Sequence, residues 1–525
     1  MYVNEASTGT DLRLVYNRGL FDHAHMRRLV DQYAHVLEQA VAEPDQQIDQ
    51  FVLADVAEAL VLPDASAALD HKWHGSVPAA ISAVAARAPG RIAVVDASRR
   101  WTFGLLAMQM GRLASWLKVR QIGRGDVVAI YGHRSGSLVW TVAGVLASGS
   151  AYVMLDPRYP ASRIAQILRI AKPKAWLALD AAGSPAAEVL AVLDDLGVEH
   201  LLTLPETADL DELDAPLALP DGPAELDPDC IGPDDVACLT FTSGSTGVPR
   251  AVIGRHGSLT HFLPWMSAEF GVGEDDRFSM LSGLSHDPLQ RDMFWPLWLG
   301  ATIVVPDPET KGTAGWLAQW MRDQRVSVAH LTPAMGQLLV EGFEADRGVA
   351  VPSLRRALFI GDVLTRGDVK RLRALAPDVQ VINLYGTTET QRASGYHVLE
   401  VDRDVPVGVR PKETLPLGRG MPGSQLLVRT SAGHSAAIGE VGEVVMRSPH
   451  LAIGYLDDAA LTAQRFTKDP FGISAQDQLY ATGDLVATAP TVWWSSSVVA
   501  TIRCSCAGFA SSSVRSPRPC VPTQR

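Results

Sequence analysis

Cysteine is scarce in this sequence, and no leader segment is recognisable in it. The 525 residues include five cysteines, too few for a disulfide framework, with neither the spacing of a metal site nor matching histidines. They are Cys230, Cys238, Cys504, Cys506 and Cys520. The first residues, MYVNEASTGT, lack the basic segment and apolar core of a signal peptide. We therefore expect a reducing, cytoplasmic location.

The chain also has fewer basic residues than acidic ones. Lysine and arginine number 46 against 58 aspartates and glutamates, and the formal net charge of -12 argues against a broad nucleic-acid surface. One uncharged run, residues 135–155, is long enough to cross a bilayer. It is interrupted by Gly144, Ser148 and Gly149, so we expect a helix that ends near Gly149, followed by a buried strand, AYVML. Neither a nucleic-acid nor a membrane partner is expected.

From about residue 76, short apolar strands alternate with helix-like segments. GDVVAIYG at 125–132 is an early strand, and VSVAHL, ALFIG and VQVINLYG are later ones. This alternation indicates an α/β architecture with parallel sheets that helices cover on both faces. Ligands of such sheets bind beyond the carboxyl ends of the strands.

The two ends of the chain differ from this body. Residues 20–42 predict an amphipathic helix that Asp22 can cap, and residues 51–75 are expected to form a linker. After Asp484 the sequence contains no acidic residue. Residues 486–525 are thus expected to be an aberrant, disordered tail or a frame-shifted end, and the pair Trp493-Trp494 favours the second interpretation.

The segment LTFTSGSTGVPRAV, residues 239–252, is the strongest local signal. It carries four hydroxyl side chains within five positions, at Thr242, Ser243, Ser245 and Thr246. Gly244 and Gly247 permit a positive φ and a close approach of the backbone to a ligand. Such a loop presents N–H and O–H donors to phosphate oxygens, and Arg250 adds a fixed positive charge. A Walker loop needs GxxxxGK followed by Ser or Thr, so the spacing disfavours a P-loop NTPase.

This loop resembles the signature loop of the adenylate-forming enzymes, which include nonribosomal peptide synthetase adenylation domains, acyl-CoA synthetases and luciferases. Arg250 stands where the family usually has lysine, and Ala251 where it has glycine. Arginine keeps the charge, so phosphate binding should persist with altered geometry. The resemblance implies an α/β fold, the large N-terminal subdomain of the adenylate-forming fold. That subdomain has parallel or mixed sheets flanked by helices, plus a small β-barrel.

A second segment, NLYGTTET at 383–390, resembles another signature of this family. The resemblance assigns its ligand-facing residues as Tyr385, Gly386, Thr387, Thr388 and Glu389. It implies that Tyr385 stacks on adenine, that Thr388 contacts phosphate and that Glu389 holds Mg²⁺. An aromatic face suits a flat base, and a hard cation between phosphate oxygens prefers a carboxylate.

A third segment, YATGD at 480–484, resembles the family's ribose-binding motif. The resemblance implies that Asp484 accepts hydrogen bonds from the ribose hydroxyls. The preceding stretch, 442–466, leads into this motif as it does in the family. Gly361 and Asp362 occupy the position that usually lines the adenine pocket.

Together these segments imply one reaction, with ATP and Mg²⁺ as cofactors. The substrate carboxylate attacks the α-phosphorus of ATP, pyrophosphate leaves and an acyl-adenylate forms. Because both reacting groups are anionic, catalysis depends on positioning and charge neutralisation rather than on a protein nucleophile. The catalytic roles fall to Arg250, Thr388 and Glu389.

The segment LSHDPLQRDMFWPLWLGA, residues 284–301, resembles the family's substrate-pocket segment. Asp287 stands where amino-acid-activating members hold the substrate ammonium, although a loop-capping role is the alternative. The other pocket positions carried over are His286, Pro288, Arg291, His330, roughly Leu358, Ile360, Leu384 and Arg392. Two arginines and a histidine indicate a second substrate carboxylate, since arginine binds carboxylates bidentately. The pattern is similar to that of aminoadipate reductases, so we expect an acidic amino acid such as 2-aminoadipate, unless Arg291 pairs with Asp292 or lies outside the pocket.

The resemblance covers roughly residues 76–485, the expected adenylation subdomain. Residues 1–50 resemble the closing part of a condensation domain, without its HHxxxDG motif. The family continues with a small mobile C-terminal lid, which carries a catalytic lysine, and with a carrier domain that bears phosphopantetheine. Neither is recognisable here, so we expect nucleotide and amino-acid binding with weak or no turnover. The expected partners are a carrier domain or neighbouring synthetase modules.

Two other functions remain open on sequence alone. An acyl- or aryl-acid–CoA ligase shares the fold, but Asp287 and the condensation-like start oppose it. An inactive, non-catalytic remnant is favoured by the unusual tail. The leading interpretation requires that the turn at 242–247, Glu389 and Asp484 converge on a single Mg·ATP.

Overall fold

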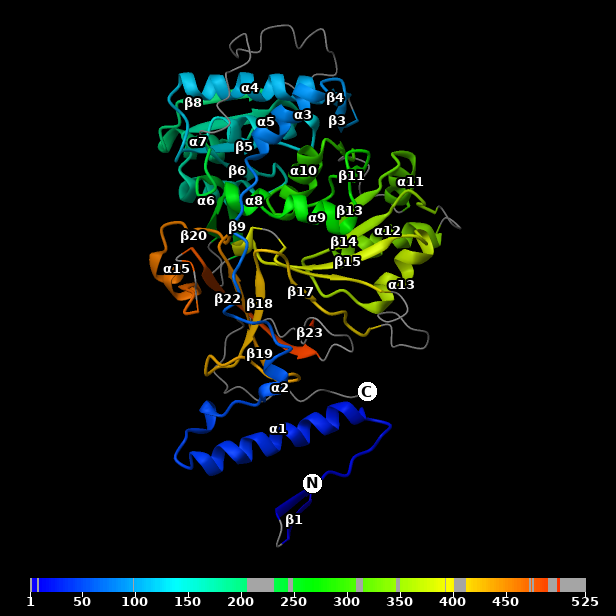
Figure 1. The fold of residues 1–525 in the computed structure, drawn as a ribbon. Coiled ribbons are helices and arrows are strands. Elements are labelled where there is room, and N and C mark those ends of the chain that lie inside the picture. The colour runs from blue at the N-terminus through cyan, green and yellow to red at the C-terminus, as the bar shows by residue number, and fades with distance from the viewer. Residues whose placement is uncertain are drawn as a thin grey trace.

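Two helix-covered sheets are stacked on a smaller antiparallel unit, and the N-terminal helix lies beyond that unit (Figure 1). The computed structural model describes residues 2–6, 9–97, 99–204, 231–243, 249–307, 315–345, 350–391, 393–400, 412–471, 474, 476–489 and 498–500. This arrangement is the predicted α/β class, with mixed sheets flanked by helices.

The first sheet has the strand order β20-β10-β9-β6-β5-β7-β8. Its strands are β5 Val127–Tyr131, β6 Ala151–Leu155, β7 Ala175–Leu179, β8 His200–Leu204, β9 Val236–Ser243, β10 Pro249–Arg255 and β20 Gly454–Tyr455. Strands β5 to β8 pair in parallel, and β9 joins β6 in parallel before the chain returns along antiparallel β10. The phosphate-loop segment therefore connects two paired strands of this sheet.

Helices cover both faces of the first sheet because its central strands are apolar on both sides. The helices are α3 Val77–Arg87, α4 Phe103–Val119, α5 Gly136–Ala147, α6 Ala161–Ala171 and α7 Ala187–Asp195. Along β5, Val128 and Ile130 pack with α3, α4 and α5, whereas Ala129 and Tyr131 pack with α6 and α7. Successive side chains of a strand point to opposite faces, so this is the double-sided burial expected of a parallel sheet.

The uncharged run at 135–155 is a helix followed by a strand, as predicted. Helix α5 ends at Ala147, Gly149 turns the chain with a φ of +84°, and β6 begins at Ala151. All residues of α5 and β6 are buried. In the part of the chain that the structure describes, no helix is long and apolar enough to cross a membrane.

The second sheet has the strand order β17-β16-β15-β14-β13-β11-β12-β3-β4. Its strands are β3 Ile92–Val95, β4 Arg100–Thr102, β11 Arg277–Ser279, β12 Thr302–Val304, β13 Val328–Leu331, β14 Arg356–Phe359, β15 Gln380–Tyr385, β16 Gly395–Val398 and β17 Arg419–Gly420. From β3 to β15 the central strands are parallel. The three later strands predicted from sequence are β13, β14 and β15.

Two groups of helices cover the second sheet. They are α9 Leu263–Phe270 and α10 Pro288–Leu299 on one face, and α11 Trp316–Asp323, α12 Pro333–Ala345 and α13 Arg366–Leu375 on the other. The short helix α8, His256–Thr260, follows β10. Because α10 lies on the same face as the side chains of Leu358 and Leu384, the predicted pocket residues of α10, β14 and β15 point into one layer.

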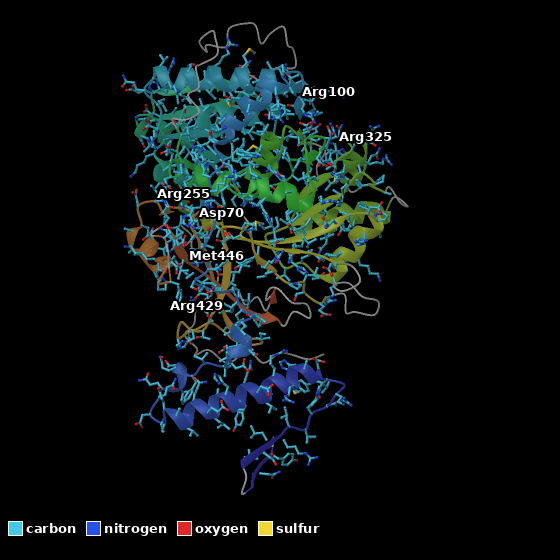
Figure 2. All side chains as sticks on the ribbon, viewed as in Figure 1. Asp70, Arg100, Arg255, Arg325, Arg429 and Met446 are labelled. Atoms are coloured by element: carbon cyan, nitrogen blue, oxygen red, sulfur yellow. The ribbon has the colours of Figure 1, made fainter. Side chains whose placement is uncertain are left out.

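The third sheet is antiparallel and stands where the small β-barrel was expected. Its strands are β18 Gln425–Arg429, β19 Val441–Ser448, β21 Phe466–Lys468, β22 Gln478–Ala489 and β23 Val498–Ala500, with α15 Ala459–Arg465 before β21. We call it the antiparallel β unit. In Figure 2, Arg255 lies where the first sheet meets this unit, and its Nε donates to the carbonyl of Leu451 at 2.9 Å.

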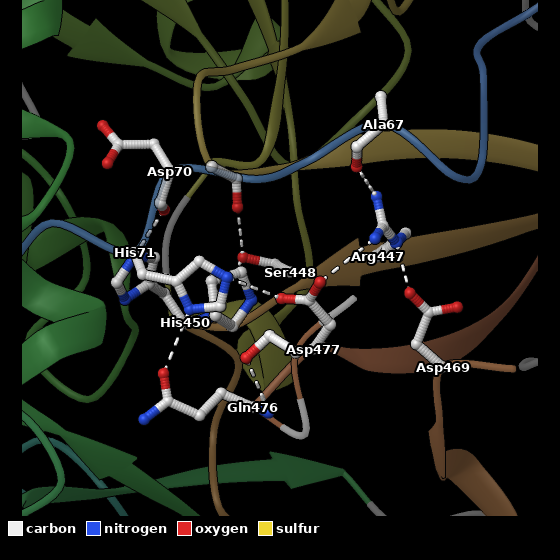
Figure 3. A network of polar contacts seen from close by, with 12 residues as sticks. Ala67, Asp70, His71, Arg447, Ser448, His450, Asp469, Gln476 and Asp477 are labelled. Atoms are coloured by element: carbon white, nitrogen blue, oxygen red, sulfur yellow. Dashed lines mark hydrogen bonds and ion pairs between the residues drawn. The ribbon is translucent and has the colours of Figure 1, made fainter. Parts of the chain in front are cut away.

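The expected linker, 51–75, contains helix α2 (Val56–Ala59) and then follows the surface of the antiparallel β unit. Figure 3 shows how it is held. Arg447 is fully buried; its Nη1 donates to the carbonyl of Ala67 at 2.6 Å, while Asp469 and Asp477 accept from its other nitrogens at 2.5 and 3.0 Å. His71 Nε2 lies 3.0 Å from Asp477 Oδ1. This segment is thus fixed to the unit over part of its length.

The N-terminal segment forms a hairpin, β1 Tyr2–Ala6 and β2 Gly9–Arg13, followed by helix α1, His23–Ala42. The predicted cap is present, because the Asp22 carboxylate accepts from the backbone N–H groups of Ala24 and His25. The apolar stripe of α1 is largely exposed, with Leu29 at 47% and Leu37 at 40%. Along the chain, apolar stripes therefore become largely buried only where the two large sheets begin.

Candidate functional site

The central cavity lies at the carboxyl ends of β14 and β15, as parallel-sheet architecture predicts. It is partly open to solvent, has an empty volume of about 490 Å³, and is lined by Ile360, Gly361, Asp362, Val363, Leu364, Asn383, Leu384, Tyr385, Gly386, Leu415, Leu417, Asp484 and Val486. Gly361 follows β14 with a φ of +95°, a conformation that favours glycine. The structure thus brings together the predicted nucleotide residues of three separate sequence segments.

Tyr385 and Asp484 are directly bonded across this cavity. The Tyr385 hydroxyl donates to Asp484 Oδ2 at 2.8 Å, although the two residues are 99 positions apart. Asp484 lies on β22, so the contact joins the second sheet to the antiparallel β unit. The resemblance assigns Tyr385 to the adenine and Asp484 to the ribose of one nucleotide, and a hydrogen bond between the two side chains was not predicted.

The phosphate-loop segment is described only at its two flanks. Thr242 on β9 pairs with Arg250 on β10, and both are partly exposed. Gly244, Ser245, Thr246 and Gly247 lie outside the described residues, as does the side chain of Ser243. Both flanking strands contact the 3₁₀ helix η4, Thr388–Thr390, which carries the second motif. Both strands that flank the loop therefore contact the segment that carries Glu389.

The substrate helix meets the second motif at Asp287. Thr388 Oγ1 donates to Asp287 Oδ1 at 3.5 Å, a long hydrogen bond between segments 101 residues apart. Asp287 stands at the N-cap position of α10, yet its side chain makes no capping hydrogen bond. Burial raises the pKa of the Asp287 carboxyl, and the nearby Arg291 opposes that rise. The side chain therefore does not cap α10, and its carboxylate faces Thr388 of the predicted nucleotide motif.

Arg291 is a buried cation without a hydrogen-bond partner among the described residues. Its side chain is 2% exposed, and none of its three guanidinium nitrogens makes a hydrogen bond. No hydrogen bond joins Arg291 to Asp292, although the charges of Asp287 and Asp292 both act on the buried guanidinium. Asp292 instead accepts from the Ser282 N–H at 2.8 Å and contacts His330 Nδ1 at 2.9 Å. A buried charge without hydrogen bonds is strongly disfavoured, so this guanidinium is suited to an anion.

His330 is the second buried nitrogen group beside Arg291. It is 2% exposed, and Asp292 holds its Nδ1 while its Nε2 has no partner within the described ranges. Burial lowers the pKa of the His330 imidazole, and the Arg291 charge lowers it further, against the opposing effect of Asp292. His330 is therefore a neutral group near pH 7 with one ring nitrogen available.

The remaining predicted pocket residues are distributed around this centre. Ile360 and Leu384 line the nucleotide-side cavity, while Leu358 is in the core behind it. Pro288 begins α10. His286 is exposed and lines a different cavity, beside Tyr152 and Arg163. Arg392 lies outside the described residues.

A buried polar chain that the sequence analysis missed links the two halves of the site. Gln391 donates to the carbonyl of Thr388 at 2.7 Å and accepts from the Cys238 thiol at 3.2 Å. Gln290, next to Arg291, donates to Cys238 Sγ at 3.3 Å. Burial raises the pKa of Cys238 to about 12, which makes it an unreactive structural thiol. In the sequence, the only indication that Cys238 is buried was its position in the apolar strand β9.

The donor set fits Mg·ATP. Mg²⁺ is commonly bound by one or two carboxylates and substrate phosphates rather than by an all-protein cage. Within the described ranges, no group of three or more His, Cys, Asp or Glu side chains is arranged to hold a metal ion. Glu389 is the predicted metal ligand; its segment contacts both strands that flank the phosphate loop, and its charge acts on Asp287. A cation there would take its other ligands from phosphate and water.

Comparison with known proteins gives a consistent result. A family model described as AMP-binding enzyme matches residues 81–456. The L-2-aminoadipate reductase of Schizosaccharomyces pombe is 37% identical over 527 residues, covering 91% of this chain and 36% of the reductase. The vanchrobactin synthetase VabF of Vibrio anguillarum is 31% identical over 404 residues, covering 76% and 13% of the two chains.

Solved structures agree at the level of the fold. The AMPPNP-bound form of the nonribosomal peptide synthetase FmoA3 matches with a TM-score of 0.76 and 25% identity. The match covers 92% of this chain and 49% of FmoA3. The chain therefore spans about half of that structure and little more than a third of the reductases it resembles.

Proposed function

Because this chain belongs to the AMP-binding enzyme family, we propose that it joins ATP to the carboxylate of an acidic amino acid such as 2-aminoadipate. The carboxylate oxygen attacks the α-phosphorus, the bond to the pyrophosphate oxygen breaks, and an aminoacyl-adenylate forms. Both reactants are anionic, so the protein acts by positioning them and by neutralising charge.

In this proposal the central cavity receives the nucleoside. Tyr385 offers its ring to the base, and Asp484 offers its carboxylate to the ribose. Thr242, Arg250 and Thr388 bind phosphate oxygens. Mg²⁺ held by Glu389 would supply positive charge to the phosphates.

Asp287 supports an amino acid rather than a simple acid as the substrate. Its carboxylate is inside the site, unused by α10, and destabilised by burial. An ammonium group placed beside it would favour the charged form and form a charge-assisted hydrogen bond. Acyl-CoA ligases have no ammonium to bind, so this group would have no role in them.

The main observation in favour of an acidic substrate is that the guanidinium of Arg291 has no hydrogen-bond partner among the described residues. All three of its nitrogens are buried without a hydrogen bond. A distal carboxylate accepts from a guanidinium through two oxygens and compensates the buried charge. His330 Nε2 adds a second polar contact on the same side. The relation to aminoadipate reductases supports the same choice.

The proposed partner is a carrier domain or a neighbouring synthetase module that takes up the activated acyl group. The named synthetases among the relatives support this choice. A carrier domain would contribute its own phosphopantetheine thiol.

Calorimetry on the full chain with AMPPNP and Mg²⁺ tests the proposal. L-2-Aminoadipate, L-norleucine and adipate share a six-carbon chain, but norleucine lacks the distal carboxylate and adipate lacks the ammonium. We expect 2-aminoadipate to bind about 10- to 100-fold more tightly than either, the range for one charged hydrogen-bonded contact. Equal binding of norleucine would contradict the acidic substrate, and equal binding of adipate would favour an acyl ligase.

Two variants test which side chain contacts each of the two charged groups of the substrate. Arg291→Met should bring 2-aminoadipate to the affinity of norleucine and leave norleucine unchanged. Asp287→Asn should bring 2-aminoadipate towards adipate and leave adipate unchanged. If wild-type protein bound no AMPPNP, the adenylation proposal itself would be wrong.

A further inference from the structure

The carboxylate of Glu389 is held by side chains that come from outside its own segment. The Tyr455 hydroxyl donates to Glu389 Oε1 at 2.8 Å, across 66 residues of sequence. Tyr480 is close enough to Tyr455 and Glu389 to interact electrostatically with both. Tyr455 belongs to β20 and Tyr480 to β22, whereas Glu389 belongs to η4. A proposed metal ligand is therefore oriented by another part of the fold.

These two phenols are fixed in a small aromatic cluster. Tyr455 is 8% exposed and Tyr480 is 4% exposed. Their rings pack on Phe466, with centroids 5.8 and 4.9 Å away. Phe466 and Tyr480 are directly opposite each other in the β21–β22 pair. Side chains packed in this way have little rotational freedom, so their hydroxyls have fixed positions.

The Tyr455 hydroxyl donates its hydrogen bond to a carboxylate acceptor. A hydrogen bond from a neutral phenol to a carboxylate is charge-assisted and hence stronger than a neutral one. The backbone adds a second tether, because Ala452 N–H donates to the Glu389 carbonyl at 3.0 Å.

We propose that Tyr455 and Tyr480 are positioning residues for the metal-binding carboxylate of Glu389. They hold its rotamer before a divalent cation arrives, so the carboxylate does not have to reorganise when cation and phosphates bind. The inference rests on the proposed function, since it requires Glu389 to be a metal ligand. It makes the metal affinity of η4 depend on the segments around β20 and β22.

Mn²⁺ titration monitored by electron paramagnetic resonance tests this on the full chain with saturating AMPPNP. Tyr455→Phe should weaken Mn²⁺ binding about 3- to 10-fold, the effect of losing one hydrogen bond to a carboxylate whose other contacts remain, and Tyr480→Phe should weaken it by a smaller factor. AMPPNP affinity measured in EDTA should stay unchanged. Tyr396→Phe is the matched control, because Tyr396 also donates to a glutamate, Glu269, at 3.3 Å.

Phe466→Leu separates positioning from simple packing. It loosens the cluster but retains both hydroxyls, so it should lower the melting temperature and weaken Mn²⁺ binding less than Tyr455→Phe does. The inference is overturned if Phe466→Leu and the two tyrosine variants weaken Mn²⁺ equally.

Glu389→Gln distinguishes this inference from its premise. If Glu389→Gln weakens Mn²⁺ binding and both tyrosine variants bind like wild type, the positioning role is wrong and the proposed function stands. If wild-type nucleotide binding shows no dependence on metal, the proposed metal site is wrong, and the positioning role with it.

Discussion

Two buried arginines in this molecule have opposite surroundings. Arg447, in the antiparallel β unit, is bonded to Asp469, Asp477, Gln425 and a linker carbonyl. Arg291, in the substrate helix, is as deeply buried and makes no hydrogen bond with the described residues. Arginine stays protonated in proteins, so neither residue can avoid its charge by losing a proton.

The contrast separates a structural charge from a charge kept for a ligand. Around Arg447 the chain supplies two carboxylates, which satisfy the guanidinium and hold the linker in place. Around Arg291 the nearest carboxylates, Asp287 and Asp292, are directed to Thr388 and His330 instead. A site that leaves a guanidinium unpaired loses stability but gains a strong donor for an incoming anion.

The largest expected effect comes from breaking the Arg447 cluster. Arg447→Met leaves Asp469 and Asp477 buried without their cation, and removal of one partner from a buried ion pair destabilises by about 3–5 kcal/mol. Urea unfolding should show this as a lower midpoint. Arg27→Met is the control, because the exposed Arg27–Asp31 pair contributes about 0.5 kcal/mol or less. An unchanged midpoint for Arg447→Met would remove the distinction between the two arginines.

The next effect concerns His256, a buried base that, unlike arginine, can lose its proton. It is fully buried, neither ring nitrogen has a partner in the described chain, and burial lowers its pKa to about 4. The unfolded value is about 6.5. Between these values the unfolded chain binds a proton that the folded chain does not, so stability falls as the pH drops from 6.5 to 4, by roughly 3 kcal/mol in total.

Unfolding midpoints measured from pH 7.5 to 4 test this for wild type and His256→Leu. Other carboxyl groups titrate in both proteins, so the difference between the two curves isolates His256. We expect wild type to lose stability faster than the variant through this window. Parallel curves would show that the buried imidazole is not the acid-sensitive group.

The smallest expected effect on stability is that of replacing Arg291, the arginine without hydrogen bonds. Arg291→Met removes no hydrogen bond and replaces a buried charge by an apolar side chain, so the unfolding midpoint should change by less than about 1 kcal/mol or rise. Thermal melting beside Arg447→Met gives the contrast directly. A loss as large as that of Arg447→Met would mean that Arg291 has a structural partner.

Local patterns made much of the fold predictable. The Asp22-capped helix, the break at Gly149 and the three strands β13 to β15 each depend on residues close in sequence. The ends of β14 and β15 could be predicted as ligand sites because parallel strands place their carboxyl ends at one edge. These features need no knowledge of distant contacts.

Other features could not be predicted because their partners are far apart in sequence. Tyr455 and Tyr480 were inside recognised segments, but the hydrogen bond from Tyr455 to Glu389 and the approach of Tyr480 depend on how two units pack. The linker's attachment to Arg447 spans 380 residues, and the chain from Gln290 through Cys238 to Gln391 spans 153.

The sequence by itself determined the class of fold, the position of the nucleotide motifs and the types of side chain available there, because periodicity and short motifs are local. Only the tertiary structure decided which charges are neutralised. Arg291 stands next to Asp292 in sequence, yet Asp292 turns to His330 and Ser282. Electrostatic pairing depends on distance and direction in space, which chain neighbours do not fix.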